Sequence, residues 1–137
     1  MNKRRVEELI PSAIDALNNK NCNIQEKSKD ENNAINFNGK IKKAYRSQIS
    51  SFGAAVTMGS FKAAVAFFVK DADGKSGIKR SELIRTVYYI IKKDWKSSED
   101  IFREISQSDQ DEAKMKEDFL NASVALKLAF NAFDLIQ

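Results

Sequence analysis

The sequence predicts an all-α protein, a compact single-domain bundle of about six helices. Apolar residues recur at spacings of three and four along nearly every segment, as in helices with one buried face. No strand–Asn-Gly–strand segment has the alternating flanks of a hairpin, and a single proline suits a helical chain. With 137 residues the chain is most simply one domain, 1–137, around one core.

The first helix is expected over about Lys3–Leu17. Pro11 interrupts its pattern, so this helix should bend there or start late. The stretch 18–40 is polar and rich in Asn and Lys, and it predicts a long loop or insertion with Ile35 and Phe37 as candidate anchors. The apolar face of the helix contains Val6, Leu9, Ile10, Ala13, Ile14 and Leu17.

The most informative stretch is Tyr45–Phe68, where Gly, Ala and Ser alternate with large apolar residues at helical spacing. It predicts a second helix over about Gly39–Met58, a break at Gly59-Ser60 and a short apolar helix over Phe61–Val69 with a central position. Small residues let two helix backbones approach closely. This stretch contains no catalytic groups, which points to a protein that works by packing and surface charge.

Three more helices are expected in the second half of the chain. Asp-Gly and a second glycine mark the loop Asp71–Gly77, after which a fourth helix spans about Arg80–Lys93. The run Ser97–Asp100 is typical of a helix start and opens a fifth helix to about Gln107. Asp109 is then expected to cap a long sixth helix reaching Leu135.

The composition argues against an enzyme. The chain has no histidine, so the usual acid/base at neutral pH and the commonest metal ligand are missing. Its single cysteine, Cys22, forms no internal disulfide and no multi-cysteine zinc pattern. No apolar run approaches the roughly 20 residues that span a bilayer, and no signal peptide is visible. We therefore expect a non-catalytic cytoplasmic protein without a cofactor and without a membrane partner.

Charge is distributed unevenly along the chain, whose formal net charge is +4. Residues 1–50 carry ten Lys/Arg against six Asp/Glu, and residues 51–96 carry nine against four. Residues 97–137 carry four against nine. A basic body with an acidic last third suits a polyanion on one face and a basic partner on another, although ordinary solvated charge is the alternative.

The segment 71–83 mimics the calcium loop of an EF-hand. Asp71, Asp73 and Glu82 take its first, third and twelfth positions. However, Lys75 puts an ammonium at the fifth position, and Ser76 replaces the glycine that the sixth requires. We therefore expect no metal here, and a calcium-responsive helical protein remains the alternative.

Two basic ridges are candidate RNA-binding surfaces. The ridge on the second helix contains Lys42, Lys43 and Arg46. The ridge on the fourth helix contains Arg85, Tyr89, Lys92, Lys93 and Lys96. Cations at helical spacing can follow phosphates, and an aromatic side chain among them offers a base a stacking surface. The alternative is a solvated helix face with a half-buried tyrosine.

Four segments together resemble the small helical subunit of the type III-B CRISPR effector, the Cmr complex. The central one is Tyr45–Phe68, with Tyr-Arg-Ser before Ile49-Ser-Ser-Phe-Gly-Ala-Ala-Val56. The others are Arg4–Ile10, Leu83–Ile91 and Ala125–Phe133. The resemblance spans most of the chain, and the stretch 18–40 matches least.

The resemblance implies an all-α, non-catalytic subunit of an antiviral ribonucleoprotein. Copies of it would stack on each other and on the large subunit, forming an inner filament beside the crRNA–target RNA duplex that the backbone subunits hold. Arg46 is then the strongest candidate for RNA contact, with Lys42 and Lys43 beside it. A purely protein-binding helical bundle is a further alternative.

Overall fold

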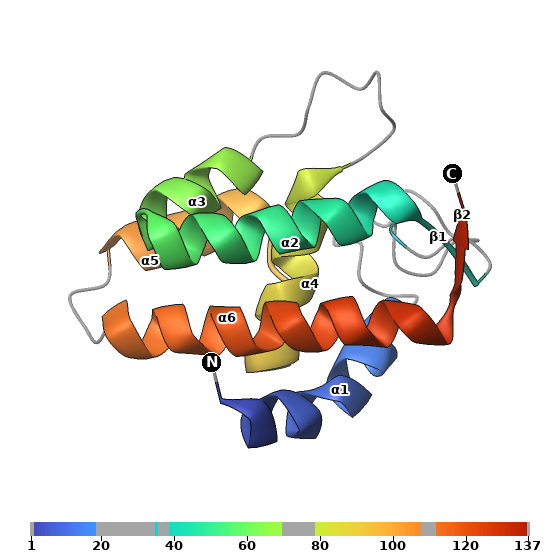
Figure 1. The fold of residues 1–137 in the computed structure, drawn as a ribbon. Helices are drawn as coiled ribbons and strands as arrows, with labels where there is room; N and C mark the ends of the chain where they lie inside the picture. Colours follow the sequence, from blue (N-terminus) through green and yellow to red (C-terminus); the bar gives the residue numbers. More distant parts are fainter. Residues whose placement is uncertain (1, 19–34, 36–38, 70–78, 108–111, 137) are drawn as a thin grey trace.

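A computed structural model of the protein describes residues 2–18, 35, 39–69, 79–107 and 112–136. Within these residues it confirms an all-α bundle of six helices (Figure 1). One short pair of strands accompanies the helices. The helices are α1 (Lys3–Asn18), α2 (Lys43–Met58), α3 (Phe61–Val69), α4 (Arg80–Lys92), α5 (Ser98–Gln107) and α6 (Glu112–Ala129). None of these helices is both long and apolar enough to cross a membrane.

Side chains mark the helix starts where the sequence places them. The hydroxyl of Ser60 accepts the Ala63 N–H at 3.1 Å, and the hydroxyl of Ser97 accepts the Asp100 N–H at 3.1 Å. Such bonds satisfy backbone donors that a first helical turn leaves without a partner. The predicted break at Gly59-Ser60 and the predicted start of the fifth helix are therefore confirmed.

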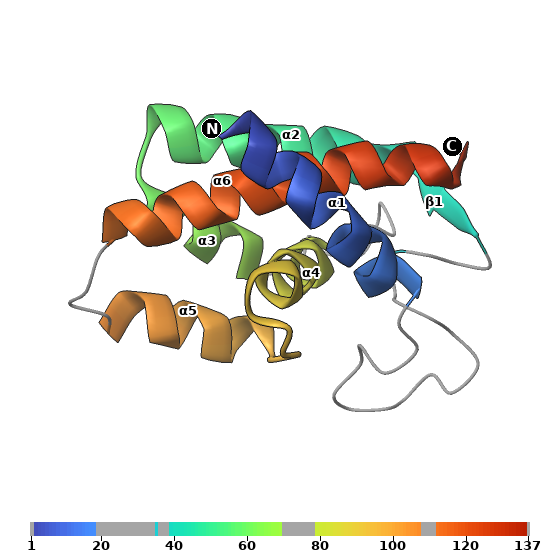
Figure 2. The ribbon, with the colours of Figure 1, turned by 90° about the horizontal axis from the view of Figure 1, so that it is seen from below.

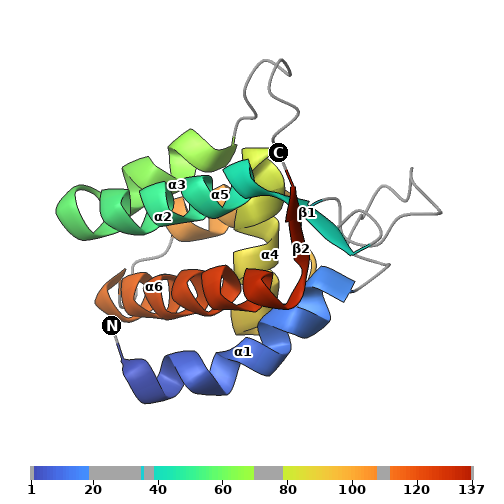
Figure 3. The same cartoon turned by 45° about the vertical axis from the view of Figure 1, so that its right-hand side comes forward.

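Helix α6 lies at the centre of the fold, packed against α1, α2 and α4 (Figures 1 and 3). Helix α3 packs on α4 and α5, and α5 lies away from α1, as the view from below shows (Figure 2). The buried side chains form one core to which all six helices contribute. Its largest fully buried members include Phe52, Phe61, Phe119, Phe130, Leu17, Leu83, Ile84 and Leu126.

The largest departure from the predicted elements is a two-stranded parallel sheet of β1 (Lys40–Lys42) and β2 (Asp134–Ile136), with Ile41 opposite Leu135. Gly39 has a φ of 84°, a conformation that glycine tolerates, and its carbonyl accepts the Asp134 N–H at 3.0 Å. The second helix therefore starts at Lys43 instead of Gly39.

The predicted sixth helix is also too long at its end. It stops at Ala129, and a 3-10 turn over Phe130–Ala132 leads into β2. Phe130 is fully buried, and the Phe133 N–H bonds to its carbonyl at 3.0 Å. With this ring buried, the chain turns toward β1. The helical periodicity of the sequence gives no sign of this turn.

Of the two outcomes expected at Pro11, a bend or a late start, the late start does not occur. Helix α1 runs from Lys3 through an exposed Pro11 to Asn18. The candidate anchor Ile35 is buried. The other anchor Phe37, the loop 71–77 and the cap Asp109 lie outside the described residues.

Two phenylalanines offer a direct test of this core. Phe119 on α6 is 2% exposed and packs edge-on against Phe61 at 5.1 Å, whereas Phe67 on α3 is 60% exposed. We expect Phe119→Ala to lower the free energy of unfolding by about 3–5 kcal/mol, because it leaves a cavity. The matched control Phe67→Ala should change it by less than about 1 kcal/mol. Urea unfolding measures both, and equal losses would contradict the fold.

Candidate nucleic-acid interface

The first ridge of cations gathers at the start of α2. Lys42 is the last residue of β1, so the expectation that it belongs to the helix is wrong, but it directly precedes the first helical residue, Lys43. Arg46 follows within the first turn. Lys43 is exposed, and Lys42 and Arg46 are partly exposed. No acidic residue lies in this first turn, and within the described ranges none of the three has an ion pair.

A fourth cation, Lys79, approaches this end of α2. The Lys79 N–H donates to the phenol oxygen of Tyr45 at 3.0 Å, and Lys79 itself is exposed. The ring of Tyr45 is buried, so it belongs to the core. Sequence reasoning missed Lys79, because its proximity depends on a contact between residues distant in the chain and no local pattern marks it.

The second ridge is not exposed along its whole length, because Arg85 is only 6% exposed, whereas Lys92 and Lys93 are exposed. Its Nη1 donates to both carboxylate oxygens of Glu82, at 3.1 and 3.0 Å, and its Nε donates to the Lys96 carbonyl at 2.9 Å. Its guanidinium also lies 5.5 Å from the ring of Trp95. Glu82, one turn earlier, neutralises the charge that would otherwise oppose burial.

Tyr89 and Lys93 are also engaged within the protein. The ring of Tyr89 stacks on Trp95 with centroids 4.4 Å apart, and its hydroxyl donates to Asp15 at 3.1 Å. The Lys93 ammonium donates to the hydroxyl of Ser12. Lys92 is exposed and lacks an ion pair within the part of the chain that the structure describes. The α4 residues therefore tie α4 to α1 and to the α4–α5 connection.

A polar cluster lies beside this connection. Lys96 Nζ and the Tyr88 hydroxyl both donate to Glu104 Oε1 at 2.9 Å. Burial alone would raise the pKa of the Glu104 carboxyl, but these two bonds and the lysine charge outweigh it and hold that pKa below its usual 4.5. The bond to Glu104 raises the pKa of Lys96, and burial raises the pKa of Tyr88. These bonds connect α4 to α5, and the three titratable side chains of the cluster are all engaged with one another.

The calcium alternative gains nothing from the structure. Both oxygens of Glu82 accept bonds from Arg85, so a cation would have to displace a largely buried guanidinium. Asp71 and Asp73 lie outside the described residues. Within the ranges that are described, no three His, Cys, Asp or Glu side chains gather in a way that could hold a metal ion.

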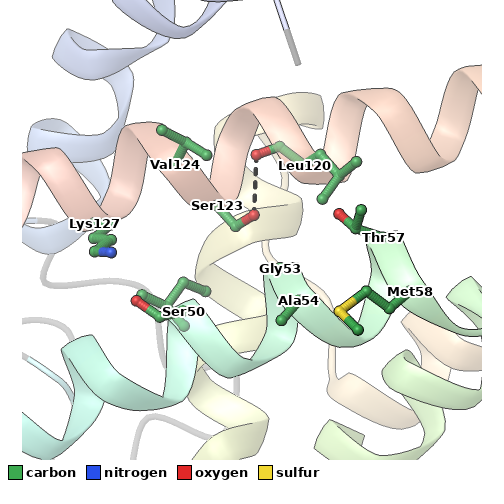
Figure 4. A pocket seen from close by; sticks show the side chains of 10 residues that line it. Ser50, Gly53, Ala54, Thr57, Met58, Leu120, Ser123, Val124 and Lys127 are labelled. Carbon is green, nitrogen blue, oxygen red and sulfur yellow. Dashed lines mark hydrogen bonds between the residues drawn. The ribbon is translucent and has the colours of Figure 1, made fainter.

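The small residues of α2 face open space. A Cβ built on Gly53 would meet no atom within 4 Å, so the close helix approach expected at this segment does not occur there. The residue lines a groove of about 530 Å³ between α2 and α6 (Figure 4). A neighbouring hollow of about 510 Å³ lies between α2 and α3, against Ala63 and Phe67. Both hollows contact Met58, which is 85% exposed.

Comparison with protein-family models, with curated proteins and with solved structures found no match for this chain. The chain itself presents three features that bear on function: cations at the start of α2, charged side chains on α4 that are paired within the protein, and an open apolar surface along α2.

The buried ion pair on α4 predicts a strong effect at Arg85 and a weak one at Lys92. Arg85→Ala leaves Glu82 largely buried without its partner, and we expect it to lower the free energy of unfolding by about 3 kcal/mol. Lys92→Ala, on the exposed side of the same helix, should change it by less than about 0.5 kcal/mol. Urea unfolding distinguishes the two variants. Similar small effects of both would show that Arg85 is an exposed cation like Lys92 and not part of a buried ion pair.

The cluster around Glu104 predicts a pH-dependent contribution to stability. Its folded-state pKa lies below the unfolded value of 4.5, so the contribution is full above about pH 4.5 and disappears as the pH falls through the folded-state value. Glu104→Gln should therefore destabilise the protein at pH 7, by under about 1 kcal/mol because the pair is partly exposed, and lose its effect at low pH.

Urea unfolding at several pH values from 7 to 3 measures this difference. Glu7→Gln, at an exposed position of α1, is the matched control and should show no such trend. A Glu104→Gln effect that stays constant across this range would show that the charge of Glu104 is not what stabilises the α4–α5 connection.

Proposed function

We propose that this chain is the non-catalytic small subunit of a type III-B CRISPR effector, a cytoplasmic scaffold that helps to hold the crRNA–target RNA duplex. The proposal begins with the resemblance of Tyr45–Phe68 to that family. Its partners would be the large subunit, the backbone subunits, further copies of itself and the RNA.

The observation that carries the proposal is the group of cations at the start of α2. Lys43, Arg46 and the preceding Lys42 lie within one turn of each other, with Lys79 nearby. An ammonium or guanidinium without an internal carboxylate partner is available to a phosphate, and several together give the salt-dependent binding typical of nucleic-acid contacts. Of these cations, Arg46 belongs to the segment Tyr45–Phe68 that resembles the family most closely, and Lys42 and Lys43 lie just before that segment.

Stacking of copies is the second part of the proposal. A head-to-tail contact joins two different surfaces of one chain and extends into an open filament when the rotation does not close a ring. The basic residues of the first two thirds and the acidic residues of the last third are complementary charges for such a contact. In this arrangement catalysis belongs to other subunits.

Charge reversal at the start of α2 tests the RNA contact. In an effector assembled with the triple variant Lys42→Glu, Lys43→Glu and Arg46→Glu, we expect target-RNA affinity to fall by at least about tenfold at moderate salt. The slope of log affinity against log salt should fall by about two to three, because up to three phosphate contacts are lost. Filter binding at several salt concentrations measures both quantities.

The matched control is Lys3→Glu, Arg4→Glu and Arg5→Glu, an equal charge change at the start of α1, away from the start of α2 (Figure 3). It should leave the slope nearly unchanged. If both triple variants bind RNA like the unmodified effector while assembly is intact, the chain is a protein-binding scaffold without RNA contact. If both lose affinity equally, bulk charge explains the effect.

A further inference from the structure

The groove between α2 and α6 is an open apolar channel with one charged end. The two helices run in opposite directions along it (Figure 1), and its walls are mostly apolar or small. The lining includes Ile49, Ser50, Gly53, Leu120, Val124 and Lys127. Figure 4 places Lys127 near Ser50 at one end and Met58 near Thr57 at the other. The groove therefore has an apolar end and a cationic end.

The α2 wall of the groove would let a helix pack closely against it. On the α2 wall, Ser50, Gly53 and Ala54 have short side chains or none. A Cβ built on Gly53 would have no atom within 4 Å. A helix backbone can come close to such a wall. The hollow on α3 shares Ala54 and Met58 with the groove, so the apolar surface continues across three helices. Amphipathic helices are the usual occupants of extended apolar grooves.

Lys127 decides what charge the occupant carries. Within the described part of the chain it has no ion pair, and it lies at the rim of an apolar surface. A helix that covered the groove would remove water from this ammonium, which is unfavourable unless a carboxylate pairs with it. The Ser123 hydroxyl does not meet this need, since it already donates within α6 to the carbonyls of Phe119 and Leu120.

We propose that the groove between α2 and α6 binds an α-helix of a different protein, not of a second copy of this chain, and that this helix is apolar where it faces Gly53 and acidic where it meets Lys127. The groove lies along the flank of α2, whereas the proposed RNA contact lies at its start. This inference is therefore independent of the RNA role, and each stands or falls by its own experiment.

Two synthetic helical peptides test the proposal on the full chain. Both have 18 residues with leucine and alanine along one face. One carries two glutamates at its C-terminal end, and the other carries two lysines there. By fluorescence anisotropy at low salt, we expect the acidic peptide to bind about tenfold more tightly than the basic one. Lys127→Glu should reverse this preference, which a merely structural role of Lys127 would not do.

A variant that fills the groove provides a second test. Gly53→Leu should weaken binding of the acidic peptide at least about tenfold, and its fold should persist because a Cβ at this position meets nothing within 4 Å. The control Ala113→Leu, at an exposed position near the start of α6, should leave binding unchanged. Circular dichroism melting confirms that each variant folds.

Three outcomes would overturn the inference. Equal binding of the two peptides would remove the role of Lys127, and binding insensitive to Gly53→Leu would place the peptide elsewhere. Sedimentation showing a dimer of the unmodified chain that Gly53→Leu dissociates would make a second copy the occupant instead of a different subunit. None of these results depends on RNA, so they leave the charge-reversal experiment on α2 to decide the RNA contact.

Discussion

The structure depends on the burial of α6 on more than one side. Its residues Phe119, Ala122, Ala125, Leu126 and Ala129 are buried, and the helix contacts α1, α2 and α4. A helix that packs in several directions fixes the spacing between its neighbours, because protein interiors are close-packed. Both ends of the chain are joined to α6, since the Asn2 N–H bonds to Asn121 on α6 at 2.9 Å and the 3-10 turn Phe130–Ala132 connects α6 to β2. The position of α2, and thus of both proposed surfaces, is set by α6.

The charges of α4 contribute to structure, which sharpens the contrast with α2. Arg85 is largely buried against Glu82 and Trp95, Lys96 pairs with Glu104, and Tyr89 stacks in the same region. These contacts hold α4 to its neighbours, and breaking a buried pair leaves a charge without compensation. At the start of α2 the cations have no such partners among the described residues. Both ridges contain cations, but on α4 several of them pair with groups of the protein, whereas within the described ranges those at the start of α2 do not.

Periodicity predicted the helices well, because amphipathic spacing reports a buried face directly. The helix start at Ser97 and the break at Gly59-Ser60 both follow from local sequence patterns, and in the structure the hydroxyls of Ser60 and Ser97 accept backbone N–H groups there. The pairing of β1 with β2 did not, since three-residue strands far apart in the chain have no local signature. The burial of Arg85 was also missed, because its spacing matches exposed cations and only the positions of Glu82 and Trp95 show otherwise. The sequence predicts close helix packing at Gly53, where the structure has an open groove, since a small residue is compatible with either arrangement.

Helix α2 combines two proposed contacts that differ in their physics. Its start offers cations to phosphates, an attraction that salt weakens. Its flank offers apolar area along Gly53 and Ala54, where binding comes from the removal of water and persists at higher salt. A partner helix on the flank would leave the start of α2 free, because Lys43 and Arg46 are not among the residues that line the groove. One helix can therefore bind a protein partner and RNA at the same time. The protein contact would then hold the start of α2 in position against the RNA.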